Sequence, residues 1–320
     1  MKPIGGYFEL ADREQGVFIH QQGVLLNTGR NALEWILLSL DRVDKVYLPS
    51  YTCDVVLEPL KRLGVPWQFY RINEKLEIDE EVNLYQNEYI IVNNYFGLKD
   101  AYIEQTAVKY GSKIIVDCAQ AFFAPVLSIV KMFYSPRKFV GVADGGIAYG
   151  VNRTAVTLFE YDSSKNSQHL YIRKMHGAEA GFPKYREDEE LLGNQHPLRM
   201  SSFTKDILEH IDYHSIISRR KKNYLILEKE LGRYNLLSLP PMDSFCAPMV
   251  YPLMVNNGKS LRMRLIENKV FVPCFWPNEI IPTAYCGVNN LSEDILPLPL
   301  DQRYGEEEMN YIVTKIKENA

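Results

Sequence analysis

The chain has 320 residues, of which 46% are hydrophobic and 24% charged, as in an ordinary soluble globular protein with a large core. Its formal net charge of −4 and pI near 5.9 provide no electrostatic attraction for nucleic acid, so no such partner is expected. One basic cluster, Arg219 to Lys222, lies in a helical pattern that also carries acidic residues, and we interpret it as a solvated helix face.

No stretch of the sequence reaches the ~20 apolar residues that span a bilayer, and the N-terminus lacks the apolar segment of a signal peptide. The five cysteines are widely spread, odd in number and contain no Cys-x-x-Cys pair, which favours free thiols over a disulfide framework or a zinc site. His210 and His214 lie four positions apart but have no further ligand at metal-binding spacing. We therefore expect a cytoplasmic protein with no membrane segment and no metal.

Short β-branched runs alternate with segments of helical periodicity through the first half of the chain. Helices are expected at residues 30–40, 55–63 and 102–110. Strands are expected at residues 45–48, 67–72, 88–93 and 113–116. Strands that alternate with helices form βαβ units, so the pattern predicts an α/β protein with a mostly parallel sheet.

The second half has a different pattern. Residues 170–200 are polar and rich in glycine, proline and charge, and we expect a long irregular excursion there. One long helix is predicted from Phe203 to about Leu231. The remaining segments mix short strands with two helices at 249–255, 261–268, 270–273 and from Glu306 onward. The sequence thus predicts a large domain of residues 1–230 and a smaller C-terminal α+β domain of residues 231–320.

An acid and a lysine stand out in the first half. The run Ile114–Val116 predicts a buried strand, and Asp117 at its carboxyl end points into the crevice where open α/β sheets bind ligands. Lys138 lies six positions before Asp144, which begins an Asp-Gly-Gly turn. An acid that pairs with a protonated ring nitrogen and a lysine that forms an imine are the minimal equipment for pyridoxal phosphate. An ordinary strand-end aspartate and a solvated lysine remain the simpler alternative.

Several segments occur in the order and spacing of a known set of motifs. They are Asn27–Leu33, Leu48–Cys53, Asn93–Gly97, Val116–Ala121, Ser135–Gly146, Leu192–Ser201 and Leu296–Glu308. Together they resemble the DegT/DnrJ/EryC1/StrS family of sugar aminotransferases. The resemblance implies fold type I of the enzymes that depend on pyridoxal phosphate, with a mostly parallel sheet flanked by helices and a smaller C-terminal domain.

The resemblance also implies roles for three residues around the cofactor ring. Lys138 would hold the cofactor as an imine and shuttle a proton between substrate and cofactor carbons. Asp117 would pair with the pyridine nitrogen and keep the ring protonated. Gln120 would donate to the phenolic oxygen of the ring; alternatively, Gln120 caps a local turn.

The cofactor phosphate needs an anchor, for which the start of the first helix is the candidate. Free backbone N–H groups and the positive end of the helix dipole meet at Thr28, Gly29 and Arg30. Gly29 allows close approach of the backbone. Thr28 is equally consistent with a plain helix N-cap. Ser135 adds a hydroxyl, although it lies three positions before Lys138 and the family serine position is occupied by Phe133.

Two further positions depart from the family pattern. Cys53 stands where the family stacks an aromatic ring on the cofactor, with Tyr51 and Tyr95 as nearby candidates. In the loop that reaches the partner subunit, Pro197 stands where the family has asparagine, so Asn194 would have to supply the contact. The resemblance implies a homodimer with the active site at a two-fold interface.

The function implied by the resemblance is transfer of an amino group from an amino acid, L-glutamate by family habit, to a keto acceptor. The usual acceptor is a nucleotide-linked keto sugar, as in polysaccharide biosynthesis, and no motif identifies the sugar or the nucleotide. The alternative is a regulatory homologue that binds the cofactor without turnover, which the departures at Cys53, Phe133 and Pro197 keep open.

Overall fold

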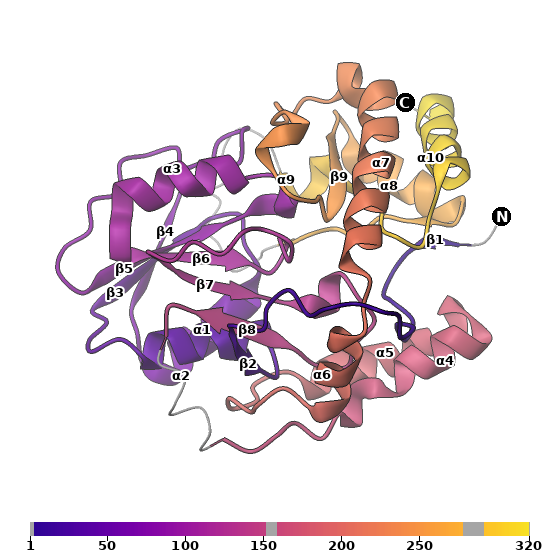
Figure 1. Cartoon of the computed structure of the whole chain (residues 1–320). Coiled ribbons are helices and arrows are strands. Elements are labelled where there is room, and N and C mark those ends of the chain that lie inside the picture. Colours follow the sequence, from indigo (N-terminus) through magenta and orange to yellow (C-terminus); the bar gives the residue numbers. More distant parts are fainter. Residues whose placement is uncertain (1–2, 152–158, 278–290, 320) are drawn as a thin grey trace.

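The computed structural model describes residues 3–151, 159–277 and 291–319 (Figure 1). Within these ranges, one sheet of seven strands forms the centre of the molecule. In the order in which they lie across the sheet, the strands are β2 (Val24–Leu26), β8 (Gly146–Tyr149), β7 (Lys131–Tyr134), β6 (Ile114–Cys118), β5 (Glu88–Asn93), β3 (Lys45–Pro49) and β4 (Trp67–Tyr70). Only β8 runs antiparallel to its neighbours, so the mostly parallel sheet is confirmed.

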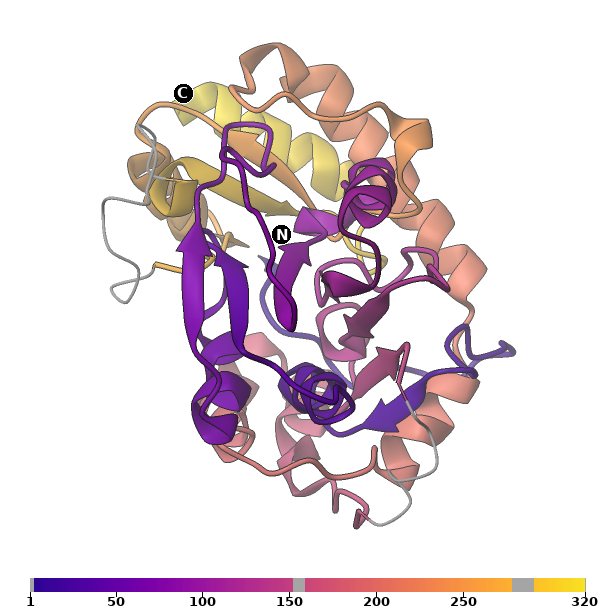
Figure 2. The same cartoon turned by 90° about the vertical axis from the view of Figure 1, so that its left-hand side faces the viewer.

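The sheet is covered on both faces, and the alternation of side chains along each strand supplies both cores. On β6, Ile115 points toward the face covered by helices α1 (Gly29–Leu38) and α2 (Leu57–Leu63). Ile114 and Val116 point toward the opposite core, which is shared with helix α3 (Asp100–Tyr110). Figure 2 shows the sheet between these layers.

The C-terminal part packs beside the sheet around a second, smaller strand pair. Strands β9 (Val250–Met254) and β11 (Ile295–Pro299) pair antiparallel. Four helices accompany them: α7 (Tyr213–Leu231), α8 (Gly258–Glu267), α9 (Leu291–Asp294) and α10 (Glu306–Asn319). The N-terminal strand β1 (Ile4–Gly5) pairs in parallel with β10 (Val270–Phe271), which brings the start of the chain onto this part of the molecule.

Two secondary-structure predictions are wrong. The predicted excursion at 170–200 contains helices α4 (Gln168–His176) and α5 (Ala178–Leu191), which pack closely against each other. Pro183 lies inside α5, and few of the helix's residues are buried, so neither propensity nor apolar periodicity marked it. The predicted long helix is two helices, α6 (Ser202–Glu209) and α7, because Ser201 and Asp212 each cap a new N-terminus.

None of the described helices is both long and apolar enough to cross a membrane.

His20 is buried between the sheet and the segment that follows β6. Its Nε2 lies 2.7 Å from the carbonyl oxygen of Phe122 and therefore carries the proton, while its Nδ1 accepts from the Tyr149 hydroxyl at 3.1 Å. Burial lowers the pKa of His20 to about 4. The unfolded chain, with an ordinary histidine pKa, therefore binds the proton first as the pH falls.

We predict that the free energy of unfolding decreases as the pH falls from 7 to 4, and that His20 contributes about 3 kcal/mol of this decrease. Urea unfolding of the wild type and of His20→Gln across this range measures the difference. His210→Gln, at a half-exposed histidine, is the control and should follow the wild type. Parallel curves for the wild type and His20→Gln would contradict the prediction.

Candidate active site

The candidate residues meet at one edge of the large sheet. Parallel strands bring their carboxyl ends together, and Asn27, Ser135 and Asp117 follow or end β2, β7 and β6 at this edge. Because β8 runs the opposite way, its first residue, Gly146, lies at the same edge. The start of the chain and the segment from Asp117 to Gly146 thus converge.

The Asp-Gly-Gly turn joins the helix start to the lysine turn. Gly145 has φ +134°, and a Cβ there would lie 2.5 Å from the ring of Pro136, which begins the turn that carries Lys138. A Cβ on Gly146 would overlap the carbonyl oxygen of Thr28. The Gly145 N–H donates to the Asn27 carbonyl in the same place. Only residues without side chains permit these approaches.

Asp144 holds the same turn through hydrogen bonds to the start of α6. Its carboxylate is fully buried and accepts from the Ser201 N–H at 2.7 Å, from the Ser201 hydroxyl at 2.6 Å and from the Thr204 hydroxyl. These donors lie at the N-terminus of α6, where the helix dipole favours a negative charge. Burial raises the pKa of Asp144, and the hydrogen bonds oppose that rise. Asp144 is therefore a structural anchor.

Asp117 and Lys138 lie close enough to interact. Burial raises the pKa of the Asp117 carboxyl, while the positive charge of Lys138 and the Ala119 N–H, at 2.7 Å, lower it. Asp117 as a whole residue is half-buried. The thiol of Cys53 shares this space: burial raises its pKa, and Lys138 lowers it. Among the described residues, the Lys138 amine has no hydrogen-bond or ion-pair partner.

Gln120 and Asn93 complete this side of the site. The Gln120 side-chain oxygen accepts from the Phe96 N–H at 3.0 Å, which holds a residue with φ +58° and leaves the amide nitrogen as a donor. Asn93 lies opposite Asp117 in the sheet, and its side-chain nitrogen donates to Thr52 at 3.0 Å. Its side-chain oxygen is buried without a partner within the described ranges.

The proposed phosphate turn has the expected local geometry. The Thr28 hydroxyl accepts from the Asn31 N–H at 3.1 Å, so Thr28 is the N-cap of α1. A Cβ on Gly29 would lie 3.4 Å from the Ser135 Cβ, which places the serine beside the turn. The Arg30 guanidinium binds Glu58 at 2.6 Å, so the backbone N–H of Arg30, rather than its side chain, faces a ligand at the helix start.

The loop that carries Asn194 is bound to its own chain. Gln195 accepts from the Asn27 side chain at 2.9 Å, and the His196 carbonyl accepts from Asn31 at 3.1 Å. Asn194 itself is exposed with φ +53°, and its N–H donates to Glu58 at 3.2 Å. The loop therefore lies beside the phosphate turn and presents Asn194 to the surface.

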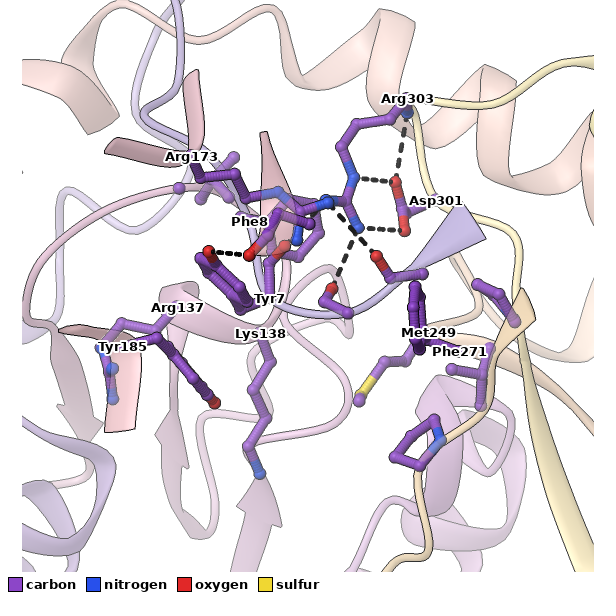
Figure 3. A pocket seen from close by; sticks show the side chains of 18 of the residues that line it. Tyr7, Phe8, Arg137, Lys138, Arg173, Tyr185, Met249, Phe271, Asp301 and Arg303 are labelled. Carbon is purple, nitrogen blue, oxygen red and sulfur yellow. Dashed lines mark hydrogen bonds and ion pairs between the residues drawn. The ribbon is translucent and has the colours of Figure 1, made fainter. Parts of the chain in front are cut away.

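A cavity of about 750 Å³ opens beside Lys138. In the view of Figure 3, the lysine side chain extends between Tyr185 of α5 and Met249 at the start of β9. The N-terminal residues Tyr7 and Phe8 line another wall. The cavity is thus built from the sheet edge, the α4–α5 pair, the N-terminal segment and the C-terminal part.

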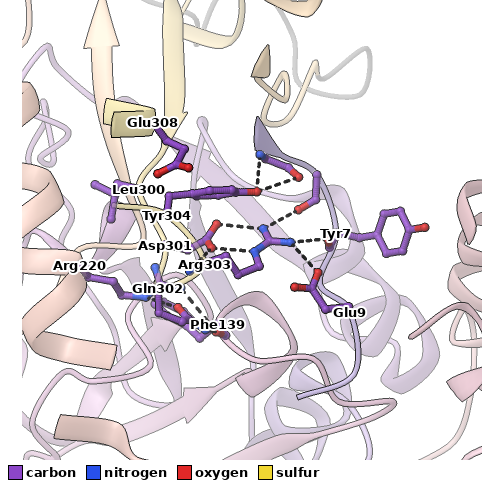
Figure 4. Close-up of polar contacts among 12 residues, drawn as sticks. Tyr7, Glu9, Phe139, Arg220, Leu300, Asp301, Gln302, Arg303, Tyr304 and Glu308 are labelled. Atoms are coloured by element: carbon purple, nitrogen blue, oxygen red, sulfur yellow. Dashed lines mark hydrogen bonds and ion pairs between the residues drawn. The ribbon is translucent and has the colours of Figure 1, made fainter. Parts of the chain in front are cut away.

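Three arginines of the cavity wall form ion pairs with carboxylates. Arg303 binds Asp301 at 2.7 Å and Glu9 at 3.3 Å, and it also donates to the Tyr7 carbonyl at 2.9 Å (Figure 4). Arg173 binds Glu9 at 2.9 Å, and Arg137 pairs with Glu189. The pairs with Glu9 hold the N-terminal segment in place. No three His, Cys, Asp or Glu side chains cluster as metal ligands in the part of the chain that the structure describes.

The sequence did not predict the far wall of this cavity. Tyr7 precedes the first predicted element, and His169 lies one residue before the segment predicted to be irregular. Arg173 and Tyr185 lie within that segment. In a sequence, polar residues at helical spacing look the same whether they line a cavity or a solvated helix face. Only the packing of α4 on α5 turns these residues inward.

The class of fold follows from the sheet and its edge. A seven-stranded sheet with one antiparallel strand, within the described ranges, and a C-terminal α+β part define fold type I of the enzymes that use pyridoxal phosphate. The predicted fold class is confirmed. No family model matches the sequence, and no curated protein is similar to it.

Solved structures of sugar aminotransferases are similar to this chain over nearly their whole length. Spr1654 from Streptococcus pneumoniae, described as a sugar aminotransferase, has a TM-score of 0.66 at 19% identity, covering 98% of this chain and 92% of that one. CalS13 from Micromonospora echinospora has a TM-score of 0.64 at 16% identity, covering 95% and 89%. A DegT DnrJ EryC1 StrS aminotransferase from Brucella abortus has a TM-score of 0.63 at 16% identity, covering 92% and 85%. Identities this low show a shared fold.

We predict that Gly146→Ala destabilises the protein by about 1–3 kcal/mol, because the added methyl group collides with the Thr28 carbonyl. Guanidinium unfolding measures the change. Gly305→Ala is the matched control, since a Cβ there would make an ordinary 3.4 Å contact with Arg219. Equal stabilities of the two variants would show that the close approach at Gly146 does not constrain the fold.

Proposed function

We propose that this protein is an aminotransferase that depends on pyridoxal phosphate and moves an amino group from L-glutamate to a nucleotide-linked keto sugar. The observation that carries the proposal is the meeting of three groups at one sheet edge: a lysine amine with no partner among the described residues, a buried carboxyl and a glycine-lined helix start. The resemblance to sugar aminotransferase motifs and the likeness to their solved structures support it.

The residues present fit the cofactor. The N–H groups of Gly29 and Arg30 at the start of α1 suit a phosphate, with the Ser135 hydroxyl alongside. Asp117 suits a protonated ring nitrogen, because a cation would lower a carboxyl pKa that burial has raised. When bound, pyridoxal phosphate supplies an aldehyde that exchanges its oxygen for an amine and a ring that takes up electrons.

Lys138 has two tasks in this proposal. Its amine would hold the cofactor, and the freed amine would carry a proton between the substrate and the cofactor. Both tasks would need an amine without a competing partner, and within the described ranges no hydrogen bond or ion pair occupies the Lys138 amine. Gln120, fixed by the Phe96 N–H, orients the ring through its amide nitrogen.

The acceptor enters through the cavity beside Lys138. Its volume of about 750 Å³ suits a ligand larger than an amino acid. Among similar structures, DesI was solved with its TDP-sugar product. A nucleotide-linked keto sugar, of the kind consumed in polysaccharide biosynthesis, is therefore the acceptor that we propose.

We propose further that the protein is a cytoplasmic homodimer. The exposed position of Asn194 beside its own phosphate turn supports a loop that meets the same loop of a second copy across a two-fold axis. In such a dimer, one loop supplies a polar group to the opposite site.

The test is reduction of the cofactor-loaded protein with borohydride, followed by peptide mapping. We predict that the pyridoxyl group lies on Lys138. In the unreduced protein, L-glutamate should abolish the visible absorbance band and release one equivalent of 2-oxoglutarate. Lys138→Arg should slow this half-reaction by on the order of 10³ or more, because it removes both the attachment and the proton carrier.

Lys131→Arg is the matched control, since Lys131 lies on β7 away from the turn, and it should behave as the wild type. A pyridoxyl group on Lys113 or Lys131, or none at all, would refute the assignment of Lys138. Cofactor binding at Lys138 without release of 2-oxoglutarate would favour the regulatory alternative.

A further inference from the structure

A histidine–aspartate pair lies in the cavity wall, apart from the residues that would hold the cofactor. His169 of α4 and Asp188 of α5 are both buried, with 2% and 0% of their surface exposed. The Nδ1 atom of His169 lies 2.7 Å from the Asp188 carboxylate. His169 lines the same cavity as Lys138.

The pair fixes the tautomer of the imidazole. A carboxylate only accepts hydrogen bonds, so Nδ1 carries the proton and donates it to Asp188. The Nε2 atom is then the ring nitrogen left for a ligand, and no hydrogen bond among the described residues uses it.

The surroundings favour an uncharged imidazole. The Asp188 carboxylate is balanced by Lys184 at 3.1 Å, and nearby Arg137 is paired with Glu189. Burial lowers the pKa of His169, against the opposing effect of Asp188. The free Nε2 atom is thus a hydrogen-bond acceptor, which suits a hydroxyl group rather than a phosphate.

Two aromatic rings lie beside the His169 imidazole. Tyr185 lies 5.4 Å from the His169 ring, edge to face, and Tyr7 lies 5.8 Å from it. Tyr7 and Tyr185 stack at 4.6 Å. These rings give this part of the wall apolar faces beside the uncharged imidazole. The C–H faces of a sugar ring pack on aromatic rings, and its hydroxyl groups donate hydrogen bonds.

We propose that His169 binds a hydroxyl group of the acceptor sugar through Nε2, and that Asp188 positions it. This inference rests on the proposed aminotransferase function and adds to it a residue that recognises the acceptor sugar. The amino donor needs no such contact. Loss of the contact therefore weakens the acceptor half-reaction and leaves the donor half-reaction intact.

Two substitutions separate this role from a structural one. His169→Asn keeps a donor at the Nδ1 position toward Asp188 and removes Nε2, whereas His169→Gln keeps a polar group at the Nε2 position. The control is His210→Asn, at a half-exposed histidine on another surface. Thermal unfolding of the three variants checks the integrity of the fold.

The experiment uses holoenzyme treated with L-glutamate and then mixed with dTDP-4-keto-6-deoxyglucose, with pyruvate as the acceptor that lacks hydroxyl groups. We expect His169→Asn to raise the KM for the keto sugar about tenfold, the value of one hydrogen bond, with release of 2-oxoglutarate from L-glutamate unchanged. His169→Gln should recover part of the loss. Asp188→Asn should also raise this KM and leave the donor half-reaction unchanged.

A second readout does not depend on turnover. In a nitrogen-15 spectrum of histidine-labelled protein, the His169 imidazole signal, assigned by its loss in His169→Asn, should shift when dTDP-4-keto-6-deoxyglucose binds. An unchanged KM in His169→Asn, the absence of this shift, or a preference for pyruvate would each overturn the role of His169. Failure of the L-glutamate half-reaction with the shift intact would instead refute the proposed function alone.

Discussion

The close approach of three backbone segments at Gly145 and Gly146 governs the geometry of the candidate site. Gly146 packs on the carbonyl of Thr28 at the start of α1, and Gly145 packs on Pro136 at the start of the lysine turn. Asp144, bound to the N-terminus of α6, holds the glycines where these contacts form. The helix start that suits a phosphate and the lysine that suits an aldehyde are therefore placed relative to each other by the same turn.

The charged groups in and around the candidate site differ in how completely they are paired. Three arginines of the cavity wall pair with carboxylates, as Arg303 does with Asp301. Asp117 is less well satisfied: its pKa is raised by burial, and the positive charge of Lys138 lowers it only in part. A buried carboxyl with an incomplete partner costs stability, and such residues gather where a ligand completes the site.

The sequence predicted the sheet edge well because local signals coincide there. The β-branched run of β6, the acid that ends it, and the glycines after Lys138 are short-range features that read directly as strand, strand end and turn. It did not predict α5, because the helix contains a proline and many charged residues and depends on packing against α4. For the same reason the sequence did not indicate His169, since its partner Asp188 lies on that helix. The role of the Asn194 loop depends on a second copy of the chain, and a single sequence does not show one.

The proposed acceptor site lies beside the proposed cofactor site, but different elements of the fold form the two sites. The cofactor residues come from strand ends of one sheet, where geometry is fixed by the hydrogen-bond register. The acceptor wall comes from α4, α5 and the N-terminal segment, which Arg303 and Arg173 tie down through Glu9.

A crystal structure of the protein with pyridoxal phosphate tests the central claim most directly. The account predicts continuous density from the Lys138 side chain to the cofactor, the ring nitrogen within hydrogen-bond distance of Asp117, and the phosphate on the N–H groups of Gly29 and Arg30. Cofactor bound elsewhere, or a phosphate held away from the start of α1, would contradict it.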